Sequence, residues 1–189
     1  MYKFIKSIGF VLSHMFYRVK INGKENIPED GAVIVCGNHL HALDAPILIF
    51  HIKRKLHFMA KVEVLKGAFL KYITKVFELI PVDRNRTDIE ALKKSLKVLK
   101  DGEVLGIFPE GTRNGLAKNV EVKSGVAYFA LKTNATVVPF GVNGNFKPFS
   151  KITYNIGKPI DISNFDVNSK EDLNKATDLI MDNIISLSK

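Results

Sequence analysis

Cysteine is almost absent from this chain of 189 residues, which contains a single one, Cys36. One cysteine excludes an internal disulfide and a metal site built on paired cysteines, and it is typical of a protein from a reducing cytosol. Cys36 lies inside an apolar run, where a thiol usually behaves as a small buried hydrophobe. We therefore do not expect Cys36 to be a nucleophile.

The sequence also lacks an apolar run long enough to cross a bilayer. The longest, residues 8–17, is interrupted by Ser13 and His14, whereas a spanning helix needs about 20 apolar residues. No small-residue cleavage site follows it, which disfavours a signal peptide. No acidic residue precedes Glu25, and the apolar side chains recur at helical spacing beside several lysines. Residues 1–19 therefore predict an amphipathic helix that either lies on a membrane surface or packs on its own domain.

Acidic residues are the minority, with 19 of them against 28 lysines and arginines, so the formal net charge is +9. Such a surplus favours an anionic partner, for example anionic lipid or a phosphorylated metabolite. The basic residues are scattered along the chain, so we expect no nucleic-acid-binding tail and no nucleic-acid partner. No repeat, low-complexity tract or linker interrupts the sequence. Residues 20–189 are therefore expected to form one domain.

Apolar runs alternate with stretches of helical periodicity along the rest of the chain. The runs that predict strands are residues 32–36, 56–60, 104–108, 136–142 and 152–156. Helices are predicted between and after them, at residues 46–53, 61–77, 87–101, 125–132 and from 169 onward. Thr87 and Glu90 are spaced as a capping box at the start of one of these helices. The alternation predicts a single α/β domain with a largely parallel central sheet flanked by helices.

Two polar turns follow two of the predicted strands. The first places His39 and Asp44 five positions apart, and the second, residues 110–113, combines a carboxylate, a glycine, a hydroxyl and a guanidinium. The ends of buried strands are where α/β folds build their active sites. A carboxylate that holds one ring nitrogen of a histidine makes the other nitrogen a general base. No serine or cysteine lies in a nucleophile elbow, so this pair suits direct attack by a substrate hydroxyl.

These turns belong to four segments that together resemble the motif blocks of the glycerolipid acyltransferase family. The segments occur in the family's order, at residues 38–44 (N-H-x-x-x-x-D), 80–84, 108–113 (F-P-E-G-T-R) and 137–140. The resemblance implies the family's α/β fold, like that of glycerol-3-phosphate acyltransferase. It also implies an enzyme of phospholipid biosynthesis that moves a fatty acyl group from an acyl thioester to a free hydroxyl.

The resemblance implies a role for each matching residue. His39 would be the general base and Asp44 would orient it. The residues that would bind the acceptor are Lys61, Arg84, Glu110, Gly111, Thr112 and Arg113. Three of them, Lys61, Arg84 and Arg113, would hold its phosphate, because one arginine rarely suffices for nearly two charges. Gly111 would allow close backbone approach, and an N–H near it would stabilise the oxyanion.

The implied acceptor is 1-acyl-sn-glycerol-3-phosphate (lysophosphatidic acid), with acyl-carrier protein or coenzyme A carrying the acyl group as co-substrate. The implied location is peripheral, at the cytoplasmic face of an anionic membrane. No metal or redox cofactor is expected, since His41 lies beside His39 without an evident third ligand. Related enzymes carry proline and glycine where this chain has Ala68 and Lys71, and a glycine near Glu78. These differences leave the preferred acyl chain and acceptor open.

Other interpretations remain at this point. The acceptor is alternatively glycerol 3-phosphate or another lysolipid. A hydrolase would use the dyad to activate water, and a non-catalytic protein that binds anionic lipid would need only the basic residues and the N-terminal helix. Glu110 and Arg113 are alternatively a structural ion pair with each other.

Overall fold

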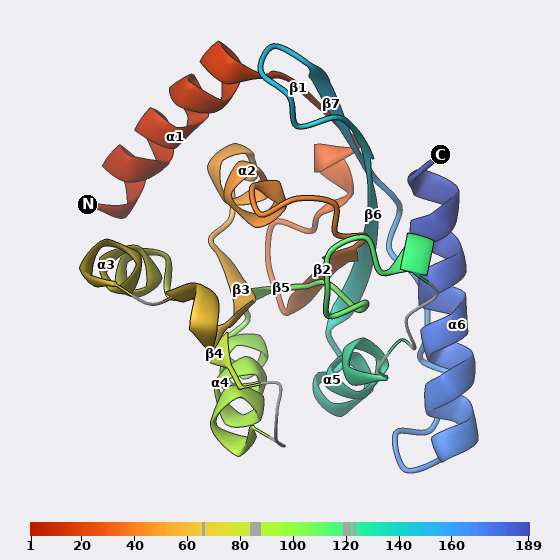
Figure 1. Cartoon of the computed structure of the whole chain (residues 1–189). Helices are drawn as coiled ribbons and strands as arrows, with labels where there is room; N and C mark the ends of the chain where they lie inside the picture. Colours follow the sequence, from red (N-terminus) through yellow and green to blue (C-terminus); the bar gives the residue numbers. More distant parts are fainter. Residues whose placement is uncertain (66, 84–87, 119–121, 123) are drawn as a thin grey trace.

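The chain folds into a seven-stranded sheet with helices on both faces (Figure 1). This architecture comes from a computed structural model, which describes residues 1–65, 67–83, 88–118, 122 and 124–189. Two residues of the sequence predictions, Arg84 and Thr87, lie outside the described part.

The strands are β1 (Arg18–Asn22), β2 (Val33–Gly37), β3 (Leu56–Lys61), β4 (Ile80–Val82), β5 (Val104–Ile107), β6 (Thr136–Gly144) and β7 (Lys151–Ile156). Their order in the sheet is β1-β7-β6-β2-β5-β3-β4. The run from β6 to β4 is parallel throughout, whereas β7 is antiparallel to β6 and pairs in parallel with β1. The predicted α/β domain with a largely parallel sheet is therefore confirmed.

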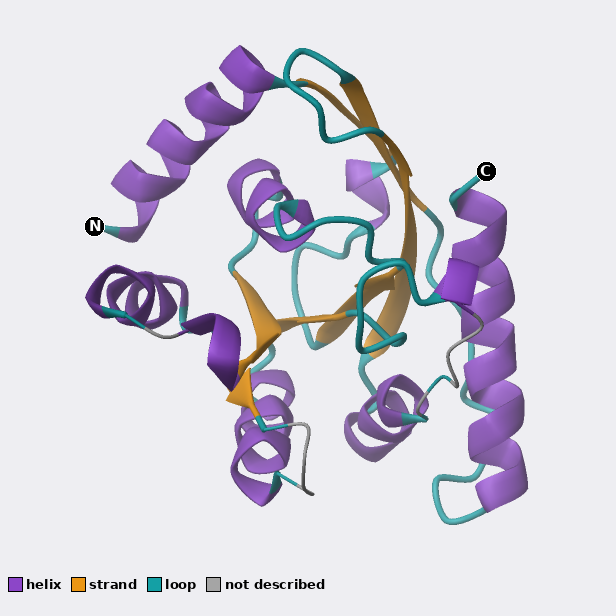
Figure 2. Cartoon of the chain, viewed as in Figure 1, coloured by secondary structure: helices purple, strands orange, loops and turns teal. Residues whose placement is uncertain are grey.

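The helices are α1 (Tyr2–Phe16), α2 (Asp44–His51), α3 (Ala68–Phe77), α4 (Ile89–Lys100), α5 (Gly125–Thr133) and α6 (Lys170–Leu187), with short 3-10 turns η1 (Lys24–Asn26), η2 (Val62–Leu65) and η3 (Leu116–Lys118). Figure 2 shows α1, α2 and α3 on one side of the sheet and α4, α5 and α6 on the other. The central strands are thus covered on both faces.

Alternate side chains of β2 fill two separate cores. Val33 and Val35 pack toward α2 and α3, while Ile34 and Cys36 pack toward α4, α5 and α6. A strand buried on both faces is apolar at every position, which explains why the apolar runs predicted these strands. Cys36 is fully buried, as predicted, and burial raises the pKa of its thiol to about 12.

Two helix ends differ from the sequence pattern. The N-cap of α4 is Asp88, whose carboxylate accepts the backbone N–H of Ala91 at 2.9 Å, so the cap predicted at Thr87 was placed one residue too early. At the end of α3, Glu78 has a left-handed backbone with φ 49°. Related enzymes were expected to carry glycine near this position, and glycine adopts that conformation without a steric cost.

Helix α1 packs on α2 through its smallest side chains. Gly9 and Ser13 are buried there, and a Cβ at Gly9 would come within 2.5 Å of the Phe50 ring. Most of the large apolar side chains of α1 are exposed, with Phe4 exposed by 67% and Val11 by 63%, whereas two near its N-terminus pack on the core beside α2. The N-terminal helix is therefore amphipathic as predicted, and most of its apolar face does not pack on the domain. Among the described helices, none has the length and hydropathy needed to cross a bilayer.

A histidine pair lies in the contact between α1 and α2. The ring of His51 is centred 5.0 Å from that of His14 and 4.8 Å from that of Phe10. Burial lowers the pKa of His51 from 6.5 to about 4, and nearby cationic side chains act in the same direction. The His51 Nδ1–H donates to the Ile47 carbonyl at 2.8 Å, while Nε2 is buried without a partner among the described residues.

His51 makes the stability of this contact depend on pH. The unfolded chain takes up a proton at His51 below about pH 6.5, whereas the folded chain resists it down to about pH 4. We therefore expect the free energy of unfolding to fall as the pH is lowered between these values. Thermal unfolding of the wild type and His51→Phe across this range tests it, since phenylalanine keeps the ring and removes the proton site. Parallel profiles for the two proteins would contradict the prediction.

Candidate active site

The two polar turns lie side by side at the carboxyl ends of β2 and β5, which are neighbours in the sheet with Cys36 opposite Ile107. The chain leaves β2 at Gly37, where a Cβ would come within 2.4 Å of the Phe140 ring and carbonyl oxygen. Only glycine fits this close approach, and it allows the next residues to turn over the edge of the sheet. Parallel strands therefore bring together the residues that the sequence places in two separate motifs.

His39 and Asp44 form the predicted pair. The His39 Nδ1–H donates to Asp44 Oδ2 at 2.7 Å, and Asp44 is fully buried as the first residue of α2. The same oxygen accepts the backbone N–H groups of Leu40 and His41, each at 2.7 Å. The Tyr154 hydroxyl, from β7, donates to the other oxygen at 3.5 Å. Four donors and the positive end of a helix offset the cost of burying this carboxylate.

The imidazole of His39 is held in one orientation. Its ring stacks on Phe108, with centroids 4.0 Å apart and planes 14° from parallel, and 17% of the side chain is exposed. Because Nδ1 carries the proton donated to Asp44, the free lone pair lies at Nε2. The site therefore presents an oriented general base.

Glu110 links the turn of residues 110–113 to the turn of residues 38–44 through a hydrogen bond. It is buried, and its two oxygens accept the backbone N–H groups of His39 at 3.4 Å and Leu116 at 3.2 Å. Burial raises the pKa of this carboxyl, although the backbone donors oppose the rise. The Asn114 N–H adds a 2.6 Å hydrogen bond to the His39 carbonyl. The alternative ion pair with Arg113 is not formed, and any acceptor contact at Glu110 would come in addition to these bonds.

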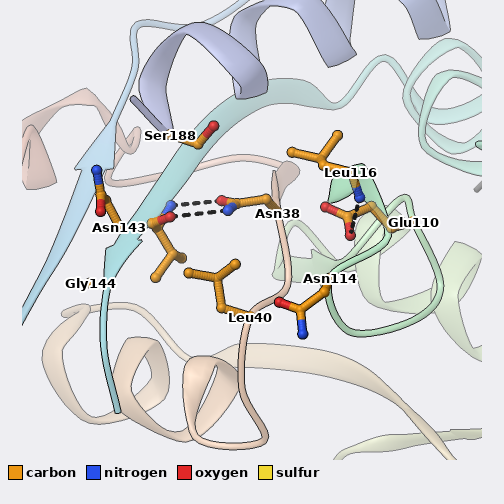
Figure 3. A pocket seen from close by; sticks show the side chains of 9 residues that line it. Asn38, Leu40, Glu110, Asn114, Leu116, Asn143, Gly144 and Ser188 are labelled. Carbon is orange, nitrogen blue, oxygen red and sulfur yellow. Dashed lines mark hydrogen bonds between the residues drawn. The ribbon is translucent and has the colours of Figure 1, made fainter. Parts of the chain in front are cut away.

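Three side chains that hold the site had no predicted role. Asn38 is buried and bonds the backbone of Val142 twice, with Nδ2 donating at 3.0 Å and Oδ1 accepting at 2.6 Å (Figure 3). This pair joins the catalytic turn to β6. Phe108 and Tyr154 belong to predicted strands, and nothing in an apolar strand marks a ring that contacts the dyad. For Asn38 the signal was its position directly before His39.

The structure describes two of the three residues that were predicted to bind the phosphate. Arg113 is exposed and pairs with no carboxylate in the described part of the chain. Lys61 is the last residue of β3, where its Nζ lies 3.2 Å from Glu63 Oε1. It stands opposite Val82 of β4, two residues before Arg84, which lies outside the described residues. The grouping of these three cations remains a prediction.

The backbone conformation at residue 111 accounts for the glycine there. This reason differs from the close backbone approach that the resemblance implies. Its φ is 63°, in the left-handed region, and no described atom would lie within 4 Å of a Cβ there. The Gly111 N–H donates to the Phe108 carbonyl at 3.0 Å, so it is already used inside the turn. The next two N–H groups, of Thr112 and Arg113, find no acceptor among the described residues.

Two adjoining pockets are lined in part by residues of the catalytic turn. One of about 290 Å³ is lined by Asn38, Leu40, Glu110, Asn114, Leu116, Val142, Asn143, Gly144 and Ser188 (Figure 3). The other, of about 470 Å³, continues toward Phe146 and Lys147 and shares Leu40 with the first. Within the described residues, no three histidine, cysteine or acidic side chains are arranged to hold a metal ion.

Known proteins share this sequence and this fold. Residues 18–143 match the model of the family described as "Acyltransferase". The 1-acyl-sn-glycerol-3-phosphate acyltransferase of Bacillus subtilis (strain 168) is 31% identical over 195 residues, which cover 99% of this chain and 96% of the relative. The enzyme of the same name from Borreliella burgdorferi is 32% identical, over 89% of this chain and 70% of the relative.

A solved structure agrees with the sequence relatives. The crystal structure of the 1-acyl-sn-glycerophosphate (LPA) acyltransferase PlsC from Thermotoga maritima superposes with a TM-score of 0.72 at 27% identity. The match covers 98% of this chain and 79% of that one. With the family model spanning the dyad and the turn of Glu110, the chain belongs to the acyltransferase family.

Proposed function

We propose that this acyltransferase moves a fatty acyl group from an acyl thioester to the free sn-2 hydroxyl of 1-acyl-sn-glycerol-3-phosphate, which yields phosphatidic acid. The observation that carries the proposal is the His39–Asp44 pair, bonded at 2.7 Å at the sheet edge of an acyltransferase fold. The names of the relatives from B. subtilis and B. burgdorferi support lysophosphatidic acid as the acceptor.

The proposed reaction is a direct transfer. Nε2 of His39 takes the proton of the acceptor hydroxyl, whose oxygen attacks the thioester carbonyl carbon. The tetrahedral intermediate then breaks its carbon–sulfur bond, and the leaving thiolate takes the proton back from the imidazolium. Asp44 stabilises that imidazolium, because its carboxylate lies on Nδ1 throughout. No step requires a metal or a redox cofactor.

The oxyanion of the intermediate needs hydrogen-bond donors near the dyad. The open N–H groups of Thr112 and Arg113 are the candidates, since the Gly111 N–H is bonded within its turn. One such donor is typically worth about 3 kcal/mol of transition-state stabilisation. This proposal specifies the donor that the resemblance placed near Gly111.

The phosphate of the acceptor is assigned to Arg113, with Lys61 and Arg84 adding charge. Arg113 has an exposed guanidinium with no competing carboxylate among the described residues, and a guanidinium binds phosphate through two parallel hydrogen bonds. Lys61 would exchange its contact with Glu63 for the phosphate, at little cost because a pair exposed by 41% and 37% is weak.

Arg113→Ala is expected to lower kcat/KM for lysophosphatidic acid by about tenfold, because one charge-assisted contact is lost from an open site. Monoacylglycerol, which lacks the phosphate, should react equally slowly with both proteins. Initial rates with the two acceptors measure the ratio. Lys132→Ala removes another exposed charge, from the last turn of α5, and should change neither rate. An unchanged ratio in Arg113→Ala would remove the residue from the phosphate site.

The membrane is the proposed location of the acceptor, with peripheral attachment at the cytoplasmic face. The outward apolar face of α1 supports this, because most of the large apolar side chains of the helix are exposed, Phe4, Val11 and Met15 among them. Lysines and an arginine flank that face, so an anionic lipid surface complements it. The donor is proposed to be acyl-carrier protein or coenzyme A carrying the acyl group, both of which are anionic.

Purified protein with an acyl thioester, with and without lysophosphatidic acid on vesicles, tests the function. We expect free thiol and phosphatidic acid in equal amounts, with little thiol released when the acceptor is omitted. Free fatty acid formed at the same rate without acceptor would indicate a hydrolase. No turnover with either donor on any lysolipid or glycerol 3-phosphate would favour a protein that only binds anionic lipid.

A further inference from the structure

The loop between β6 and β7, residues 145–150, carries an aromatic ring in an unfavourable position. Phe149 is 68% exposed, and its φ of 62° lies in the left-handed region. A bulky side chain rarely adopts that conformation, which glycine or asparagine tolerates far better. The chain thus holds a large apolar ring in water on strained backbone, and neither the catalytic dyad nor the cores use it.

This loop and the end of α1 form one surface. The Phe149 N–H donates to the Phe16 carbonyl at 2.6 Å, and the Arg18 N–H donates to the Ser150 carbonyl at 2.9 Å. Met15 and Phe16 are themselves exposed by 54% and 47%. Figure 1 shows the loop beside the C-terminal end of α1. Phe149 therefore extends the outward apolar face of the helix.

The charged residues in the segments that carry these apolar side chains are all cationic. Arg18, Lys147 and Lys151 are exposed around the loop, and neither residues 1–24 nor residues 143–157 contain an acidic side chain. Large apolar groups mixed with cations fit the interface of an anionic bilayer, where rings enter the acyl region and the cations meet headgroups. The charge pattern favours lipid over a second copy of this basic chain, which would repel it.

The other end of the same loop contacts the catalytic turn. Phe146 stacks on His41, with ring centroids 4.5 Å apart and planes 18° from parallel, and it meets Tyr17 edge-on at 6.1 Å. The His41 backbone N–H is one of the donors to Asp44. The pocket of about 470 Å³ lies along this contact. Any surface that this loop contacts would thus lie next to the turn that carries His39 and Asp44.

We propose that Phe149 is a second membrane anchor, which inserts its ring beside α1 into an anionic lipid surface and sets the catalytic turn close to that surface. The proposal rests on the peripheral membrane attachment proposed above. It adds a specific residue and a second point of contact, which together fix the orientation of the domain on the bilayer.

The chain contains no tryptophan, so Phe149→Trp creates a single fluorescent reporter at the loop. On vesicles of phosphatidylglycerol and phosphatidylcholine, we expect its emission to shift to the blue and to be quenched by brominated acyl chains. Ile89→Trp is the matched control, because Ile89 is 58% exposed on α4, on the opposite face of the sheet. Its emission should not change on the same vesicles.

Phe149→Asn separates stability from membrane binding. Asparagine accepts the left-handed backbone and removes the ring, so we expect a higher thermal unfolding midpoint together with about tenfold weaker partitioning to vesicles. Turnover of a short-chain acceptor below its critical micelle concentration should stay near wild type. Weaker partitioning with a lower unfolding midpoint would indicate a structural role and overturn the inference.

The outcomes distinguish the two levels of the proposal. If the wild type sediments with vesicles while the tryptophan at 149 stays unshifted and unquenched, the loop anchor is wrong and attachment through α1 stands. If the wild type fails to sediment with anionic vesicles at all, the peripheral attachment itself fails, and the loop anchor fails with it.

Discussion

Replacing His39 with alanine is expected to lower kcat for acyl transfer by roughly 10²- to 10⁴-fold, since a positioned general base typically contributes that much. The KM for the acceptor should change little, because the imidazole is assigned to proton transfer rather than to binding. The fold should survive, since the side chain lies at the sheet edge and keeps 17% exposure. Steady-state thiol release measures the rate, and thermal unfolding checks the fold.

His41→Ala is the matched control for this variant. His41 lies on the same turn, and its backbone rather than its imidazole bonds Asp44. We expect less than about a tenfold loss, which reflects the ring contact with Phe146 and the hydrogen bond that His41 Nδ1 accepts from the Leu43 N–H at 3.3 Å. Equal losses in the two variants would mean that the turn matters as a structure and that His39 is not the base.

Asp44→Asn is expected to cost roughly 10²- to 10⁴-fold in kcat as well, because the amide removes the charge that stabilises the imidazolium. The effect on stability should be larger than for His39→Ala. Asp44 is fully buried and its Oδ2 alone accepts three hydrogen bonds, so an amide NH₂ facing any of those donors leaves them unsatisfied.

The comparison needs both activity and thermal unfolding of the same preparation. Asp182→Asn, on the exposed side of α6, should match the wild type in both measurements. Near-wild-type turnover of a folded Asp44→Asn protein would show that the carboxylate does not support His39.

Much of the fold was predictable from the sequence because the central strands are buried on both faces. β1 was missed because the prediction relied on continuous apolar runs, whereas β1 alternates polar and apolar residues, as a strand with one side in water does. β4 was missed because it has three residues, one of them proline. In the sheet, β1 pairs with β7 and β4 pairs with β3.

In the site, too, local features were predictable and long-range contacts were not. His39 and Asp44 were predictable because they lie five positions apart in one turn. The contacts that support them join distant segments: Glu110 bonds the His39 backbone across 71 positions, and Asn38 bonds Val142 across 104. No local pattern encodes such a pair. The resemblance implied an acceptor contact at Glu110, which stays a prediction, but no local pattern indicated that its oxygens accept the backbone N–H groups of His39 and Leu116.

The central claim is that the acceptor hydroxyl attacks the thioester directly, with no acyl-enzyme. The most direct test mixes the protein with a stoichiometric acyl thioester and no acceptor. Intact-mass spectrometry then measures any acyl group on the protein, and thiol release is followed during the first turnover. The account predicts an unmodified mass and no burst of thiol, because Cys36 is fully buried and no described serine, threonine or cysteine is hydrogen-bonded to the His39 ring. A mass increase of one acyl group with a burst equal to the enzyme concentration would contradict it.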